Sequence, residues 1–96
     1  MHGRRTASGE RIYNDIYACA HRTLPFGTML NVYCPATDKT VIVKVIDRGP
    51  FTKGRIIDLS WAAAKDLGII AHGSTKVVIT KCVETVPSDS TKTNNN

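Results

Sequence analysis

The chain has 96 residues, a length that suits one domain with a single modest core and excludes a second domain. Hydrophobic residues make up 42% of the sequence and aromatic residues 6%, which indicates a globular fold built on aliphatic side chains. The net charge is +5, but the basic residues are scattered and not interleaved with aromatic ones, so we expect no nucleic-acid binding. No apolar run approaches the length of a membrane-spanning helix.

Three cysteines, Cys19, Cys34 and Cys82, lack the CxxC spacing of zinc ribbons and thioredoxin-like redox pairs. We therefore expect no metal site, and no cofactor is predicted. Because the number of cysteines is odd, two alternatives stay open. Either two of them form a disulfide and one remains a free thiol, or all three are buried and reduced. Cys19 and Cys34 lie in two successive predicted strands and are the pair to test for a disulfide.

The first part of the chain predicts loops and one short strand. Residues 2–10 are small and polar with two glycines, which is typical of a solvated loop with a turn at Ser8. A turn is predicted at residues 14–15, followed by a strand over residues 16–20. His21 lies where this strand gives way to a loop, so it either faces a cleft or acts as a structural histidine.

The middle of the chain predicts a β-hairpin. Residues 28–33 and 40–46 are strand candidates, and a polar turn at residues 36–39 joins them. Five of the six residues from 41 to 46 are valine or isoleucine, which is typical of a central strand buried on both faces. Asp47 and Arg48 follow where this strand stops. A carboxylate in such a place can be fixed for acid–base chemistry, or its side chain can simply bond turn amides.

The only helix signal follows a short return strand over residues 55–59. Ser60 is a suitable N-cap for the segment WAAAKDL, and Gly68 is a suitable C-cap. Trp61, Ala64 and Leu67 fall on one helical face, which predicts that this face packs in the core.

Two further expectations concern the residues on either side of the helix. Asp58, before the cap, is expected to order the start of the helix or to pair with an arginine. Residues 75–83 alternate as a last strand, with Val77 and Ile79 on one face and Val78 on the other. The polar tail over residues 87–96 is expected to be disordered.

Four motifs, in the order HGRRTASGE, AHRTLPFGT, VIDRGPF and GRIIDLSWAAAKDLG, resemble the double-psi β-barrel domain of the rare lipoprotein A family. The resemblance assigns residues 2–84 to this domain and implies a mainly β fold, a six-stranded double-psi β-barrel with one short helix. In the family a first strand precedes HGRRTASGE, where this sequence has only Met1. The resemblance therefore leaves open whether that strand is formed.

Characterised members of the family are lytic transglycosylases that cut peptidoglycan glycan strands, preferably strands stripped of stem peptides. The resemblance implies this activity, with a 1,6-anhydro product. The alternative is a non-catalytic glycan-binding module of the cell envelope that uses the same groove, and a third interpretation is a structural barrel that engages a protein partner.

The resemblance also implies a partner and a location. Peptidoglycan glycan strands are the expected partner, and the bacterial periplasm or outer membrane is the expected location. The sequence has no lipobox cysteine, so we expect membrane attachment only through a lipid anchor that this chain lacks. The oligomeric state stays open.

The family's acidic catalytic positions fall on Glu10 and Asp47, and its histidine falls on His21. The resemblance implies that Asp47 acts as general acid and then as base, while Glu10 stabilises charge or positions a sugar. His21 would orient a carboxylate or bond the substrate. The residues expected to bind substrate are Arg5, Thr6, Ser8, Arg48 and Phe51.

Arg48 raises a difficulty for this assignment, because a neighbouring guanidinium lowers the pKa of a carboxyl group that must be protonated to act as an acid. If the strand alternation continues, Arg48 points away from Asp47 and pairs with Asp58 or another surface carboxylate. A contact between Arg48 and Asp47 would instead favour Glu10 as the acid.

Overall fold

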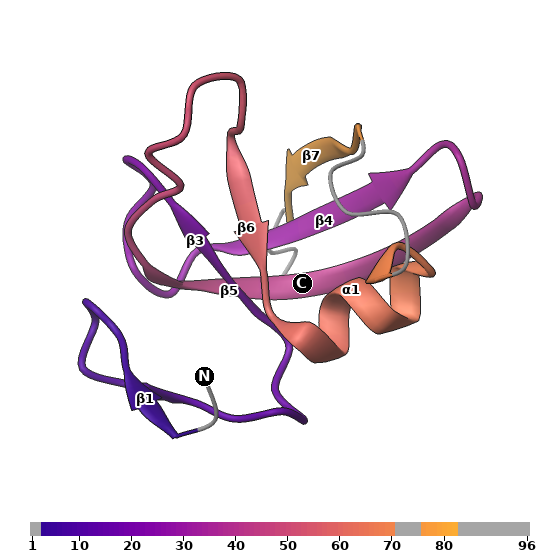
Figure 1. Ribbon diagram of the computed structural model, residues 1–96. Coiled ribbons are helices and arrows are strands. Elements are labelled where there is room, and N and C mark those ends of the chain that lie inside the picture. Colours follow the sequence, from indigo (N-terminus) through magenta and orange to yellow (C-terminus); the bar gives the residue numbers. More distant parts are fainter. Residues whose placement is uncertain (1–2, 71–75, 83–96) are drawn as a thin grey trace, which may run out of the picture.

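A computed structural model describes residues 3–70 and 76–82, and it consists of a curled five-stranded sheet, a two-stranded ribbon and one short helix (Figure 1). The strand order in the sheet is β6-β3-β5-β4-β7. Its strands are β3 (Ala18–His21), β4 (Met29–Cys34), β5 (Lys39–Asp47), β6 (Ile57–Leu59) and β7 (Val78–Lys81). The pair β3 and β5 is parallel, and the other pairs are antiparallel. The expected mainly β fold with one short helix is confirmed, and the larger sheet has five strands among the described residues.

The central strand β5 is buried on both faces only in its second half. Val41, Val43 and Val45 point into the core, where they join side chains of β4 and of the helix. The expectation of burial on both faces is wrong for the first half, because Ile42 is 51% exposed on the opposite side. Near the end of the strand Ile46 is 1% exposed, and its carbonyl accepts the amide of Ser8 from the N-terminal segment.

Helix α1 (Trp61–Leu67) begins and ends where the sequence predicts. The side chain of Ser60 accepts the amide of Ala63, and Gly68 has a φ of 76°, the left-handed conformation that glycine adopts without strain. The predicted buried face is wrong at Trp61, which is 53% exposed. The centre of the buried face is instead the pair Ala63 and Leu67, which are four residues apart and fully buried.

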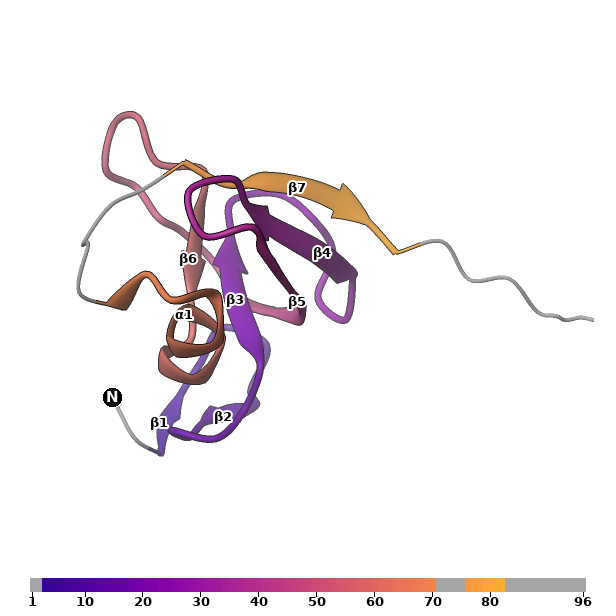
Figure 2. The same ribbon diagram turned by 90° about the vertical axis from the view of Figure 1, so that its right-hand side faces the viewer.

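The N-terminal segment forms a ribbon rather than the expected solvated loop. Strands β1 (Arg4–Arg5) and β2 (Arg11–Ile12) pair in antiparallel fashion. Thr6 is only 6% exposed, and its hydroxyl donates to the carbonyl of Glu10 at 2.6 Å, which closes the loop between the two strands. Figure 2 shows the ribbon at the end of the sheet beside the start of α1.

The three cysteines are free thiols in this structure, so the disulfide to be tested between Cys19 and Cys34 is not formed. These two side chains are buried in the core, whereas Cys82 is partly exposed. Burial raises the pKa of the Cys19 thiol to about 12, which makes it unreactive at neutral pH.

The last described strand alternates as predicted. Val77 and Ile79 pack against the core, while Val78 is 52% exposed. The predicted tail over residues 87–96 lies outside the described residues. Within the described ranges, no helix has the length and apolar character needed to cross a bilayer.

Candidate active site

A cleft of about 580 Å³ lies where the N-terminal ribbon, the end of β5 and the start of α1 meet. The ribbon and the turn after it contribute Arg4, Ile12, Tyr13 and Asn14. The sheet and the β5–β6 loop contribute Cys19, Ala20, Ile46, Asp47, Arg48, Gly49, Pro50, Phe51, Thr52 and Arg55. The chain from β6 into the helix contributes Asp58, Leu59, Ser60 and Trp61.

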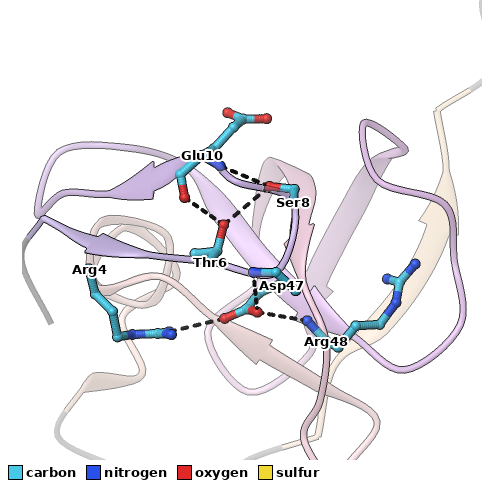
Figure 3. Close-up of polar contacts among 7 residues, drawn as sticks. Arg4, Thr6, Ser8, Glu10, Asp47 and Arg48 are labelled. Carbon is cyan, nitrogen blue, oxygen red and sulfur yellow. Dashed lines mark hydrogen bonds and ion pairs between the residues drawn. The ribbon is translucent and has the colours of Figure 1, made fainter.

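Asp47 is fixed in this cleft by three donors. It is the last residue of β5 and lies opposite Ala20 of β3. Its Oδ1 atom accepts the backbone amides of Ala7 and Arg48, each at 2.9 Å. Its Oδ2 atom accepts Nη2 of Arg4 at 3.0 Å, and the Asp47 side chain is 18% exposed (Figure 3).

These contacts determine the charge of Asp47. Burial by itself would raise the pKa of Asp47, but the amides of Ala7 and Arg48 and the guanidinium of Arg4 outweigh it and hold the pKa below its ordinary value. Asp47 is therefore a carboxylate at neutral pH in the free protein, and its charged partner is Arg4 rather than Arg48.

The side chain of Arg48 turns away from Asp47, as the strand alternation predicts. Its Nη1 atom donates to the carbonyls of His21 at 3.2 Å and Leu24 at 2.8 Å, and its guanidinium lies 4.0 Å from the centre of the Phe26 ring. The predicted pairing of Arg48 with a carboxylate is wrong, because the loop after β3 offers these carbonyls and an aromatic face at the same place.

Arg22 ties the same two loops together from the other side. Its Nε atom donates to the carbonyl of Pro50 at 2.6 Å, and its Nη2 atom donates to the carbonyls of Thr52 at 3.1 Å and Arg55 at 2.8 Å. One guanidinium thus fixes the segment that carries Phe51. No sequence pattern indicates this role. Every residue has a backbone carbonyl, so the partners of Arg22 cannot be identified by their residue type.

The second predicted carboxylate, Glu10, does not face Asp47. Its Oε1 atom pairs with Nζ of Lys44 at 2.9 Å, and the two side chains are 47% and 41% exposed. Figure 3 shows the Glu10 carboxylate turned away from Asp47, with Thr6 between them. The described structure does not bring Glu10 into the wall of the cleft.

His21 holds the loop after β3 in place. Its Nδ1 atom accepts the amides of Thr23 and Leu24, each at 3.2 Å, so the proton of the neutral ring is on Nε2. Partial burial, together with the positive charges of Arg48 and Arg22, lowers the pKa of His21. The imidazole is therefore neutral at pH 7, and it lies outside the wall of the cleft.

The remaining predicted binding residues fall into two groups. Arg5, Thr6 and Ser8 build the loop of the ribbon, where Arg5 donates to the Gly9 carbonyl and the Thr6 and Ser8 hydroxyls lie 3.1 Å apart. Phe51, in contrast, is 80% exposed at the cleft.

Two aromatic residues of the cleft, Tyr13 and Trp61, are absent from the predicted site. The helical spacing of Trp61 assigned it to the core, and Tyr13 precedes the turn at residues 14–15 and belongs to no motif. Among the described residues, no group of three or more His, Cys, Asp or Glu side chains is placed to hold a metal ion.

Comparison with known proteins identifies the family. Residues 1–79 match the family model described as lytic transglycolase. Over 73 residues, or 76% of the chain, the sequence is 57% identical to the probable endolytic peptidoglycan transglycosylase RlpA of Aquifex aeolicus. It is 50% identical over 79 residues, or 82% of the chain, to the protein of the same name from Synechocystis. It is 52% identical over 74 residues, or 76% of the chain, to the endolytic peptidoglycan transglycosylase RlpA of Pasteurella multocida.

These matches cover 32%, 25% and 25% of the three relatives, so the chain corresponds to one part of proteins that are several times longer. The part matched by the family model contains all four sequence motifs, the cleft around Asp47 and the curled sheet up to the first half of β7. The chain therefore belongs to the RlpA family and contains its double-psi β-barrel domain.

Proposed function

We propose that this chain is a catalytic domain that cleaves peptidoglycan glycan strands by lytic transglycosylation. The observation that carries the proposal is the Asp47 carboxyl group, held by three donors in a cleft with exposed aromatic side chains. The names of the relatives point to the same substrate, and the cell envelope follows as the place of action.

The chemistry assigns two successive roles to Asp47. The protonated carboxyl group first donates its proton to the glycosidic oxygen, and the bond from that oxygen to the sugar C1 breaks as an oxocarbenium-like centre develops. The resulting carboxylate then takes the proton of the C6 hydroxyl of the same sugar, whose oxygen bonds to C1. The products are a strand end with a free hydroxyl and a 1,6-anhydro sugar, and Asp47 is protonated again.

Asp47 needs a proton for the first step, and Arg4 opposes it in the free protein. The Arg4 side chain is 44% exposed and lines the cleft, so a glycan strand that enters the cleft can displace it at modest cost. Loss of the guanidinium and exclusion of water by the strand both raise the pKa of Asp47. Substrate binding thereby prepares the acid form.

Glu10 and His21 act in support of Asp47 in this proposal. The exposed pair between Glu10 and Lys44 is worth little, about 0–1 kcal/mol, so Glu10 can leave it and turn its charge toward the positive centre of the transition state. His21 is a positioning residue, because it fixes the turn whose carbonyls hold Arg48.

The five predicted binding residues also have roles in this proposal. Phe51 offers its exposed ring to a sugar face. Arg5, Thr6 and Ser8 fix the loop that holds the Ala7 amide on Asp47. Arg48 fixes the loop behind it through the carbonyls of residues 21 and 24.

The alternative, a glycan-binding module without turnover, is favoured by two observations. The two carboxylates do not face each other, and the pKa of Asp47 is lowered, so the free protein does not present a ready acid. The experiment for the proposed function must therefore measure products and binding together.

The test incubates the chain with purified glycan strands that lack stem peptides, and mass spectrometry identifies the products. The parent should release 1,6-anhydro-terminated fragments, and Asp47→Asn should lower the turnover by at least about 100-fold, the usual contribution of an acid–base residue. Glu10→Gln should lower it less. The matched control is Asp38→Asn, because Asp38 lies in the turn between β4 and β5 and bonds Tyr33.

Strand binding without product in the parent would leave the non-catalytic module as the function. Equal turnover by the parent and Asp47→Asn would exclude Asp47 as the acid.

A further inference from the structure

The tryptophan of this chain lies in an unusual place for so large an apolar side chain. Trp61 is the sole tryptophan in the sequence, and it is 53% exposed at the first residue of α1. Trp61 lines both the cleft of Asp47 and a second, more apolar groove of about 740 Å³ that follows residues 54–59. A large aromatic ring exposed at the junction of two hollows points to a binding role, because burial in the core would stabilise the fold more.

The Trp61 ring has a cationic neighbour on its own helix. The Nζ atom of Lys65, one helical turn later, lies 5.1 Å from the ring centre. The ammonium group of Lys65 therefore lies over one face of the indole. This contact favours one orientation of the ring, which reduces the conformational entropy that the ring loses when a ligand stacks on it.

Polar groups that suit a sugar line the same cleft as Trp61. Arg55 and Asp58 form an exposed ion pair, with Nη2 and Oδ1 3.1 Å apart, and both residues line the same cleft as Trp61. Such a pair can exchange its contacts for hydroxyl and acetamido groups at little cost. The carbonyl of Arg55 is also bound by Arg22, which fixes the backbone at this place.

The cleft has room for more than the sugar ring that reacts at Asp47. Its volume of about 580 Å³ is in the range of sites that enclose a ligand of several rings, roughly 300–1,000 Å³. Phe51 and Tyr13, which are 80% and 40% exposed, line the same cleft. Aromatic faces that alternate with polar groups match a pyranose, which has an apolar C–H face and a polar rim.

We propose that Trp61, with Arg55 and Asp58, forms a remote sugar subsite that holds a pyranose ring of the glycan strand away from the bond cleaved at Asp47. This inference rests on the proposed function for the identity of the strand. The subsite adds binding energy without touching the reacting atoms, so its loss weakens substrate binding and leaves the chemical step unchanged.

Tryptophan fluorescence reports directly on this subsite, since Trp61 has no other tryptophan to mask its signal. The binding probe is a β-1,4-linked N-acetylglucosamine hexamer, titrated into the parent chain. We expect a saturable change in emission with the hexamer and a much weaker one with the monomer.

Variants then separate the subsite from the fold. Trp61→Ala should raise KM for glycan strands about tenfold, equivalent to about 1.4 kcal/mol of binding, with kcat within about twofold. Trp61→Phe should recover most of the affinity because it keeps an aromatic face. Ile42→Ala, at a side chain that is 51% exposed on the outer face of β5, is the matched control and should change neither constant.

The outcomes separate the two proposals. Strand cleavage with equal KM in the parent and Trp61→Ala would overturn the subsite and leave the proposed function intact. A saturable Trp61 response without any cleavage would support the subsite and overturn the catalytic role. A parent chain that neither binds nor cleaves glycan overturns both, and a loss of kcat in Trp61→Ala at unchanged KM would overturn the remote position of the subsite.

Discussion

The guanidinium of Arg4 binds the carboxylate of Asp47 across 43 residues of sequence, with Nη2 and Oδ2 3.0 Å apart. Together with the Ala7 amide, this contact joins the N-terminal ribbon to the end of the central strand. The ribbon therefore supplies two of the three donors that keep Asp47 ionised. The state of the acid depends on a segment that packs against the sheet without being part of it.

Arg4→Gln should move the pH dependence of cleavage. If protonated Asp47 is the acid, kcat/KM falls as the pH rises through the pKa of Asp47 in the free enzyme. Arg4 helps to hold that pKa below its ordinary value, so removing the charge raises the pKa and shifts the falling limb toward higher pH. The measurement is kcat/KM on glycan strands across the pH range. Arg4→Lys keeps the charge, so the falling limb of its pH profile should lie between those of the parent and Arg4→Gln. A falling limb that stays in place in Arg4→Gln would contradict the role of Arg4.

The contact between Arg4 and Asp47 should also make the free energy of unfolding depend on pH. The folded-state pKa of Asp47 lies below its unfolded value, so its contribution is present above the unfolded pKa, near 3.9, and is lost as the pH falls through the folded pKa. The free energy of unfolding of Arg4→Gln should therefore be lower than that of the parent at pH 7, and the difference should shrink in acid. Urea unfolding of both proteins, at pH 7 and at an acid pH below the unfolded pKa, measures this difference.

Local signals predict the frame of the fold well, for physical reasons that particular residues illustrate. Ser60 and Gly68 fix the two ends of α1 through their own backbone chemistry, and the structure has both caps where predicted. The hairpin of β4 and β5 follows from two apolar runs and a polar turn. Burial is less predictable, because Ile42 and Ile46 belong to the same run of valine and isoleucine, yet Ile42 is 51% exposed and Ile46 is 1% exposed.

The candidate site is less predictable for a related reason. Asp47 follows from its position at the end of a strand, but its partner Arg4 comes from a segment whose composition indicates a solvated loop. Arg22 and Arg48 bind carbonyls, which every residue has, so no complementary residue type identifies their partners. Trp61 is misassigned because its helical spacing from Ala64 and Leu67 fits a buried face.

His21 can be tested by separating its acceptor atom from its acid–base chemistry. His21→Ala leaves the amides of Thr23 and Leu24 without their acceptor and should lower the free energy of unfolding by about 1 kcal/mol. His21→Asn places an oxygen near the position of Nδ1 and should recover most of that loss. Thermal unfolding measures both variants.

Turnover by the His21 variants distinguishes positioning from catalysis. In a positioning role, His21→Asn keeps most of the kcat of the parent and leaves the pH profile unshifted. A stable His21→Asn chain that has lost turnover would show instead that the imidazole takes part in the chemistry through Nε2.

Arg22 should control the segment that carries Phe51. Arg22→Ala removes three hydrogen bonds to the carbonyls of Pro50, Thr52 and Arg55, and water can replace part of them at this exposed place. We therefore expect a loss of about 1–2 kcal/mol in unfolding free energy and a higher KM for glycan strands. Arg22→Lys keeps the charge but lacks the planar guanidinium group. It should therefore recover only part of the unfolding free energy and only part of the affinity for glycan strands. An unchanged KM in Arg22→Ala would show that the segment keeps its shape without this contact.

Ser60 forms hydrogen bonds outside the helix as well as within it. Its removal should therefore lower the free energy of unfolding by more than the loss of an ordinary N-cap does. Its Oγ atom accepts the amides of Ala63 at 3.4 Å and Ala18 at 3.1 Å, and it donates to the carbonyl of Ile16 at 2.7 Å. The residue is 3% exposed, so water cannot replace these partners without a local opening. Ser60→Ala should lower the free energy of unfolding by about 2–3 kcal/mol, the sum of a lost cap and an unpaired buried amide.

The matched control for Ser60→Ala acts at the other end of the same helix. Gly68→Ala forces a side chain into the left-handed conformation and brings its Cβ atom to 3.4 Å from Thr37, so it should cost about 1 kcal/mol through the helix alone. Amide hydrogen exchange at Ala18 separates the two effects. Exchange at Ala18 should accelerate in Ser60→Ala and stay slow in Gly68→Ala, because the Ser60 hydroxyl accepts the Ala18 amide, whereas Gly68 lies at the opposite end of the helix. Equal protection of Ala18 in both variants would mean that Ser60 acts as a helix cap and nothing more.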